Sequence, residues 1–135
     1  MVANLKEILK EAIAAGIAAR DAKTTELLER ARNEEWSQED ICGWTWIDID
    51  PKTCRSIMLL GMDGVRVTFR IKSRGFVVED TQLHLDNISD HQRFSASMAG
   101  IRAAAEVLRR DGIKAEARGS LIRRRVRVRD EVAAW

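Results

Sequence analysis

The 135-residue chain has no tyrosine, one proline and two cysteines, and no stretch of the roughly 20 apolar residues that a bilayer span needs. Its longest apolar run, Ala12 to Ala19, is alanine-rich and lies within a charged, helix-like segment. The N-terminus lacks the basic, apolar and cleavage-site order of a signal peptide, and Glu7 and Glu11 argue against a transit peptide. We therefore expect a cytoplasmic protein with no membrane partner.

The two cysteines, Cys42 and Cys54, fall on what we predict to be consecutive strands of a hairpin that turns near Pro51. In that register Cys42 lies opposite a residue near Gly61, so no disulfide is expected, as is usual for a cytosolic chain. The length suits one hydrophobic core. We predict a single domain over residues 1–135.

The net charge of +2 conceals a strong asymmetry. Residues 1–50 carry six basic and eleven acidic side chains, whereas residues 102–129 carry ten basic and three acidic ones. The acidic and basic segments either pair with each other within the folded chain or attract a charged partner. Both alternatives are kept open here.

Residues 4–36 are helix-like throughout, with Leu5, Leu9 and Ile13 among the apolar residues that recur at helical spacing. A helix of about 30 residues would be roughly 45 Å long, which is more than a domain of this size covers. Small residues around Gly16 permit close approach of another backbone. We favour a homodimer or higher homo-oligomer formed through this helix; the alternative is a break into two helices after Arg20.

After the helix the apolar period changes to two, which is typical of strands. Asp63-Gly64 between two such runs is a hairpin signal. We predict a four-stranded antiparallel meander with one dry and one wet face. The predicted strands are Ile41–Ile49, Cys54–Met62, Val65–Lys72 and Phe76–His84.

A second helix is predicted over His91–Arg110, with Ser89 and Gln92 spaced as a capping box and Gly112 ending it. Two further strands, Ile113–Arg118 and Leu121–Arg129, are expected to join at Gly119-Ser120. The predicted fold class is α+β, in the order α-β4-α-β2.

The final predicted strand carries a row of arginines on one face, about 6.7 Å apart. Guanidinium groups donate paired hydrogen bonds to phosphate or carboxylate, and like charges this close need a compensating partner. Alternatively, the acidic N-terminal helix covers them. Arg124 points to the apolar side, where it needs an acid or a bound anion. The predicted phosphate-binding residues are Arg123, Arg124, Arg125, Arg127, Arg129 and Arg70.

Aromatic and polar side chains supply a second set of candidates. Trp44 and Trp46 share one side of a predicted strand and suit stacking on a base, although burial in a core or interface is the more common role of tryptophan; Phe76 has the same two readings. Asn87, His91 and Gln92 lie around the N-terminus of the second predicted helix, which favours an anion.

Catalysis and metal binding have weaker support in the sequence. General acid–base chemistry at His84 or His91 is the enzymatic alternative. The chain has no phosphate loop and no Gly-x-Ser-x-Gly motif. A metal site from Cys42, Cys54 and the histidines lacks a recognised ligand spacing. We therefore predict no catalytic residues, no metal and no cofactor.

The layout resembles the phage-encoded Thoeris anti-defence proteins, which sequester cyclic ADP-ribose-type signals. The similarity lies in the chain length, the helix over residues 4–36, the sheet ending near Phe76, the Asn87 loop and the arginine-rich end. The resemblance implies a phage anti-defence sponge in the host cytoplasm: an oligomer that binds a nucleotide without turnover, with arginines on phosphates and an aromatic ring on the base.

Three functional hypotheses follow. The first is a non-catalytic protein that sequesters a small phosphate-bearing, nucleotide-type ligand. The second is a nucleic-acid-directed binding or inhibitor protein that uses the arginine face, which predicts steep salt dependence. The third is a small nucleotide hydrolase or lyase that uses His84 and His91.

Overall fold

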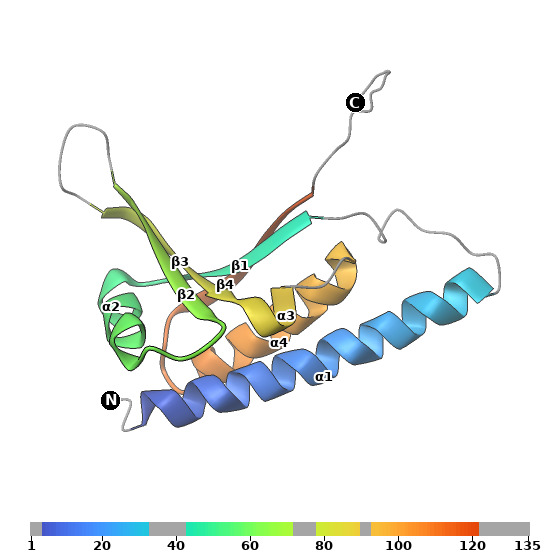
Figure 1. Ribbon diagram of the computed structural model, residues 1–135, viewed down its shortest axis with the longest axis horizontal. Helices are drawn as coiled ribbons and strands as arrows, with labels where there is room; N and C mark the ends of the chain where they lie inside the picture. Colours follow the sequence, from blue (N-terminus) through green and yellow to red (C-terminus); the bar gives the residue numbers. More distant parts are fainter. Residues whose placement is uncertain (1–3, 33–42, 72–77, 90–92, 122–135) are drawn as a thin grey trace, which may run out of the picture.

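The computed structural model describes residues 4–32, 43–71, 78–89 and 93–121, which form a four-stranded antiparallel sheet with helices on one side (Figure 1). The α+β class and the long N-terminal helix are confirmed. The elements are α1 (Leu5–Arg32), β1 (Gly43–Ile49), α2 (Pro51–Leu60), β2 (Val65–Ile71), β3 (Val78–Leu85), α3 (Asp86–Ser89), α4 (Phe94–Arg110) and β4 (Ala115–Leu121).

The strand order is β2-β3-β1-β4, so the sheet is not a simple meander. β1 is central and pairs with β3 on one side and with β4 on the other. From β1 onward the chain follows a β-α-β-β-α-β path in which each helix joins two strands that are not neighbours. This topology places β1 and β3 side by side in the middle of the sheet, although about 30 residues separate them.

The predicted strand over Cys54–Met62 is wrong, because residues Pro51–Leu60 form α2. The Asp50 side chain accepts hydrogen bonds from the Thr53 backbone N–H at 2.9 Å and from the Thr53 hydroxyl at 2.7 Å. Pro51 has no backbone N–H to lose and sits at the start of the helix, where its fixed φ is favourable. The residues that we had assigned to a hairpin turn are thus an N-terminal cap.

The end of α2 is set by Gly61, whose φ of +61° is in the left-handed region. Cys54 and Ile57, three residues apart, are the buried side chains of this helix. Cys54 is a free thiol, and burial raises its pKa to about 11. Asp63-Gly64 leads from α2 into β2 rather than between two strands, so this hairpin prediction is also wrong.

The predicted turn at Gly119-Ser120 is wrong as well, because β4 runs through both residues. Gly119 pairs with Thr45 and lies directly over α4: a Cβ added there would lie 2.7 Å from the Phe94 Cζ and 2.6 Å from the Met98 sulfur. The glycine is therefore needed for close packing between sheet and helix. The predicted strand Leu121–Arg129 lies, after Leu121, outside the described residues.

α1 is continuous through Arg20, which contradicts the alternative of two shorter helices. Its small residues pack against α4 of the same chain (Figure 1): a Cβ added at Gly100 would lie 2.7 Å from the Gly16 carbonyl oxygen. The close approach predicted for a second copy is thus made within one chain at this point. Residues 33–36 of the predicted helix lie outside the described part.

The second long helix begins at Phe94, with Arg93 as its N-cap and no side-chain capping bond. The predicted capping box is wrong at Ser89, which ends α3 and bonds to β1 instead. The predicted end is confirmed: Gly112 follows the helix with a φ of +85°.

The core lies between the sheet and the helices. Ile47 and Leu83 on the central strands are fully buried, and so are Ile101 and Leu108 of α4 and Leu9 of α1. In the part of the chain that the structure describes, no helix is long and apolar enough to cross a membrane.

Candidate functional site

The face of the sheet that points away from the helices carries polar and aromatic side chains. On β1, Thr45, Ile47 and Ile49 are buried, so the alternating residues lie on the opposite face. The register aligns this set across the sheet, with Arg66 opposite His84 and Trp46 opposite Arg118. The prediction of one dry and one wet face is confirmed. The wet face carries Arg66, Thr68, Gln82, His84, Trp44, Trp46, Asp48, Glu116, Arg118 and Ser120.

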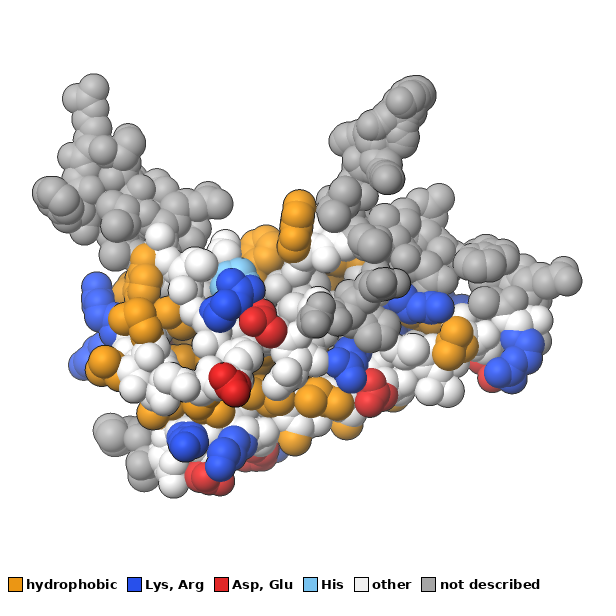
Figure 2. Space-filling view, viewed as in Figure 1, with side chains coloured by type: hydrophobic (Ala, Val, Ile, Leu, Met, Phe, Trp, Pro, Cys, Tyr) orange, Lys and Arg blue, Asp and Glu red, His pale blue; other side chains and the backbone are white. Residues whose placement is uncertain are grey.

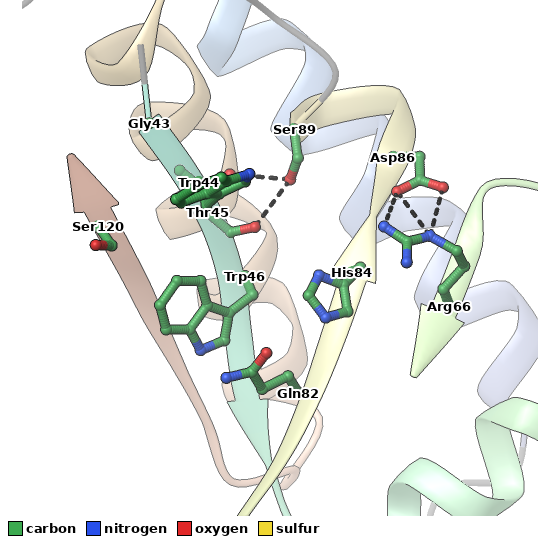
Figure 3. A pocket seen from close by; sticks show the side chains of 10 residues that line it. All are labelled: Gly43, Trp44, Thr45, Trp46, Arg66, Gln82, His84, Asp86, Ser89 and Ser120. Atoms are coloured by element: carbon green, nitrogen blue, oxygen red, sulfur yellow. Dashed lines mark hydrogen bonds and ion pairs between the residues drawn. The ribbon is translucent and has the colours of Figure 1, made fainter. Parts of the chain in front are cut away.

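A pocket of about 660 Å³ opens at one end of this face (Figure 3). Its origin is local: β1 and β3 pair only at Ile47–Leu83 and Asp48–Gln82, so the start of β1 has no partner strand on that side. The pocket is lined by Gly43, Trp44, Thr45, Trp46, Arg66, Gln82, His84, Asp86, Ser89 and Ser120.

α3 closes the back of this pocket. The helix starts directly after β3 and brings Ser89 against Thr45. The Thr45 hydroxyl donates to the Ser89 Oγ at 2.9 Å, and the Ser89 hydroxyl donates to the Thr45 carbonyl oxygen at 3.3 Å. The Ser89 hydroxyl thus accepts from the Thr45 side chain and donates to the Thr45 backbone, and the wall is built from neutral polar groups.

Trp44 stands at the edge of the pocket with 65% of its surface exposed, which is unusual for an aromatic ring of this size. The start of β1 packs closely against its neighbours: a Cβ added at Gly43 would clash with the Phe94 ring of α4 and lie 2.7 Å from the Ser120 carbonyl oxygen of β4. Trp46 is half-buried, and its indole N–H donates to the Asp48 carboxylate at 2.9 Å, which orients the ring.

His84 lies between the aromatic residues and an ion pair. Its Nε2 is 3.1 Å from the Thr68 hydroxyl. The Arg66 guanidinium donates to both oxygens of Asp86, at 2.9 Å from Nη2 and 2.9 Å from Nε. Burial lowers the pKa of His84 from 6.5, and the charge of Arg66 lowers it further against the opposing effect of Asp86. His84 is therefore neutral at pH 7, with one donor and one acceptor nitrogen.

The described part of this face is not basic. Arg66 is paired with Asp86, and Arg118 with Asp48 at 2.9 Å and with Glu116 at 3.2 Å. The hydrogen bonds from Arg66 lower the pKa of Asp86, so this carboxylate stays charged. Figure 2 shows the same mixture, with basic and acidic side chains interspersed over the visible surface. The described face is therefore suited to a planar polar group more than to an isolated phosphate.

The structure brings Trp44 into the pocket, together with Trp46, the second stacking candidate, and His84, the histidine of the enzymatic alternative. Asn87 is exposed on α3 and does not line it; its carbonyl accepts from the Arg20 Nη1 at 2.5 Å, and its side chain lies beside Gly64. Arg70 pairs with Asp80 through the β2–β3 ladder, and its side chain is outside the described part. The other predicted contacts also lie outside the described residues: Phe76, His91, Gln92, Arg123, Arg124, Arg125, Arg127 and Arg129.

Sequence reasoning missed the polar half of the pocket. Gln82, Asp86 and Ser120 carry no motif, and they meet only because β3 and β4 flank β1. The period-two alternation assigns Gln82 and His84 to one face of a strand. It does not say which strand lies beside them.

Among the described residues, no group of three or more His, Cys, Asp or Glu side chains is placed to hold a metal ion. Comparison with known proteins finds no matching family model, no matching curated protein and no matching solved structure.

Proposed function

We propose that this chain is a non-catalytic binding protein whose open sheet face takes the base of a nucleotide-type ligand. The observation that carries the proposal is Trp44, a mostly exposed indole beside a polar pocket of about 660 Å³. Tryptophan usually stabilises a protein by removing its large apolar surface from water, and an exposed ring does not gain this free energy. Stacking on a base would bury the ring and supply it.

The chemistry of the pocket suits a base edge. The Gln82 amide, the Ser120 hydroxyl and the neutral His84 ring offer donors and acceptors around the stacking position. A few such polar groups beside an aromatic wall are the usual composition of a small-ligand site. Stacking on one aromatic side chain contributes about 1–3 kcal/mol per base.

The phosphate contacts in this proposal come from the arginine row predicted in the sequence. Leu121, the last described residue of β4, pairs with Gly43 next to Trp44. Arg123 follows two residues later, and two residues of chain span at most about 7 Å. The arginine row thus starts within covalent reach of the pocket. Sequestration of a nucleotide signal, which the resemblance implies, is one use of such a site.

The proposal is tested by titrating a panel of nucleotides and short oligonucleotides while following tryptophan fluorescence and heat of binding. Trp44→Ala should weaken binding roughly 5- to 150-fold, the equivalent of about 1–3 kcal/mol, and Trp44→Phe should retain most of it. Leu59→Ala is the matched control, because Leu59 is 84% exposed on α2 and does not line the pocket.

Equal binding by Trp44→Ala and the unaltered protein would refute the proposal. A second measurement separates binding from turnover: the protein is denatured after incubation and the ligand is recovered. The non-catalytic proposal expects unchanged ligand. Altered ligand, with the alteration lost in His84→Ala, would establish the hydrolase alternative instead.

A further inference from the structure

The wet face carries more than one ring. Trp44 and Trp46 lie on the same side of β1, two residues and therefore about 6.6 Å apart along the strand. Trp46 on β1 and His84 on β3 lie next to the last paired residues, Ile47 and Leu83, and both line the pocket that opens where the two strands stop pairing. Figure 3 shows Trp46 and His84 on these neighbouring strands, with Gln82 beside them. Three rings, Trp44, Trp46 and His84, thus line the pocket between the two central strands.

The spacing selects the kind of ligand. Bases that stay stacked on each other repeat at about 3.4 Å along a strand. Two rings carried by residues about 6.6 Å apart along a strand suit two bases that are unstacked from each other, each on its own ring, which is how single strands are recognised. A duplex keeps its bases inside the stack and cannot place them on Trp44 and Trp46.

The openness of the face favours a long ligand over a small one. Sites for free small molecules usually bury about 70–90% of the ligand surface. Here the pocket opens onto a sheet face that continues with Thr68, Asp48 and Glu116 across all four strands. A mononucleotide on Trp44 leaves the Trp46 ring unused, whereas a strand of two or more nucleotides engages both indoles.

We infer that the ligand of this face is single-stranded nucleic acid of at least two successive nucleotides, stacked on Trp44 and Trp46 with His84 beside the second base. The inference rests on the proposed function and narrows its ligand. Four-stranded sheets that stack two or three bases on aromatic side chains of this kind are a recurrent platform for single-stranded RNA. The polar neighbours, Gln82 and Ser120, are placed to contact base edges.

The test compares three kinds of probe on the full chain by fluorescence anisotropy. They are uridine monophosphate as competitor, labelled single strands (oligouridine and oligothymidine) of about eight nucleotides, and a duplex of the same length. This length lies within the roughly 4–16 nucleotides of known single-strand sites. We expect a single strand to bind at least about tenfold tighter than the mononucleotide or the duplex. Trp44→Ala and Trp46→Ala should each weaken single-strand binding roughly 5- to 150-fold.

Trp46 also bonds to Asp48, so His84→Ala is the second variant if Trp46→Ala unfolds; it should also weaken single-strand binding. Leu59→Ala is again the control. Equal affinity for mononucleotide and single strand, both lost in Trp44→Ala, would overturn this inference while upholding the proposed function. Equal duplex binding would overturn it too. Single-strand binding that Trp44→Ala does not change would refute the inference and the proposed function together.

Discussion

Gly16→Ala should destabilise the protein, although alanine is the better helix-forming residue. Gly16 is buried where α1 crosses α4. A Cβ added there would clash with the Ile88 Cδ1 and lie 2.9 Å from the Gly100 carbonyl oxygen. Ile88 is fully buried, and the carbonyl oxygen belongs to the backbone of α4. The two helices would therefore have to separate.

Two opposing terms set the magnitude. Replacing glycine by alanine in a helix interior stabilises by about 1 kcal/mol. Forcing an extra carbon into a packed core costs about 1–3 kcal/mol. Because the added methyl meets both a fixed side chain and a backbone oxygen, we place the cost in the upper half of that range. The net loss is about 1–2 kcal/mol, which lowers the melting temperature by roughly 2–8 °C.

The assay is urea and thermal unfolding followed by circular dichroism. Ala18→Gly, at an exposed position of α1, measures the helix-propensity term without any contact with α4. If Gly16→Ala were more stable by about the amount that Ala18→Gly loses, α1 and α4 would not be in contact at Gly16. A different outcome is also informative: Gly16→Ala leaves the stability of the monomer unchanged but dissociates a dimer. That outcome would show that the small residues of α1 pack against a second copy of the chain.

Three further predictions concern local chemistry. Asp50→Ala should lower the free energy of unfolding by about 1 kcal/mol in chemical denaturation, since it removes the N-terminal cap that binds Thr53. Burial raises the pKa of Asp50, but the hydrogen bonds from Thr53 outweigh it and lower the pKa below 3.8. The stabilisation by the charged cap is therefore present above pH 3.8 and is lost as the pH falls below it. In a Cys42→Ala background, Cys54 should react with a thiol reagent only as fast as the protein unfolds, because the thiol is buried and its pKa is about 11. His84 has a lowered pKa, so the unfolded chain binds more protons as the pH falls through 6.5, and stability should decrease there; His84→Gln should remove that part of the pH profile of unfolding.

Features with a strong local period were predictable. The apolar spacing of Leu5 and Leu9 indicated α1, and the alternation of Val65, Val67 and Phe69 indicated β2. The Gly112 stop of α4 also follows from local backbone preference. In these segments the residues that face the core are neighbours in the sequence, so the pattern can be seen without knowing what covers them.

α2 shows where local reasoning is ambiguous. Asp50-Pro51 marks a turn between two strands and equally the cap and first residue of a helix. The residues that follow can form either a strand or a helix. The helix forms because it buries Cys54 and Ile57, which are at helical spacing. That burial is a tertiary contact with β2 and β3, which the segment itself does not encode.

The pocket could not be predicted from the sequence for a similar reason. Trp44 was a candidate because an aromatic pair on one strand face is visible in the sequence. Gln82 and Ser120 flank it only because β1 lies between β3 and β4. Pairing over such distances in sequence depends on the packing of the whole sheet.

The charges of the described face bear on how a nucleic acid would be held. Arg66 and Arg118 already face three carboxylates, Asp86, Asp48 and Glu116, so with His84 neutral the sheet offers no net attraction for phosphate. A phosphate that took either guanidinium would leave a carboxylate without its partner, which disfavours indiscriminate binding of polyanions. In our proposal the sheet therefore selects unstacked bases, while the arginines after Leu121 supply the counterion-dependent part of the affinity. The two contributions separate by salt: changes at Trp44 should shift affinity equally at all ionic strengths, whereas charge reversal at Arg125 and Arg127 should flatten the salt dependence.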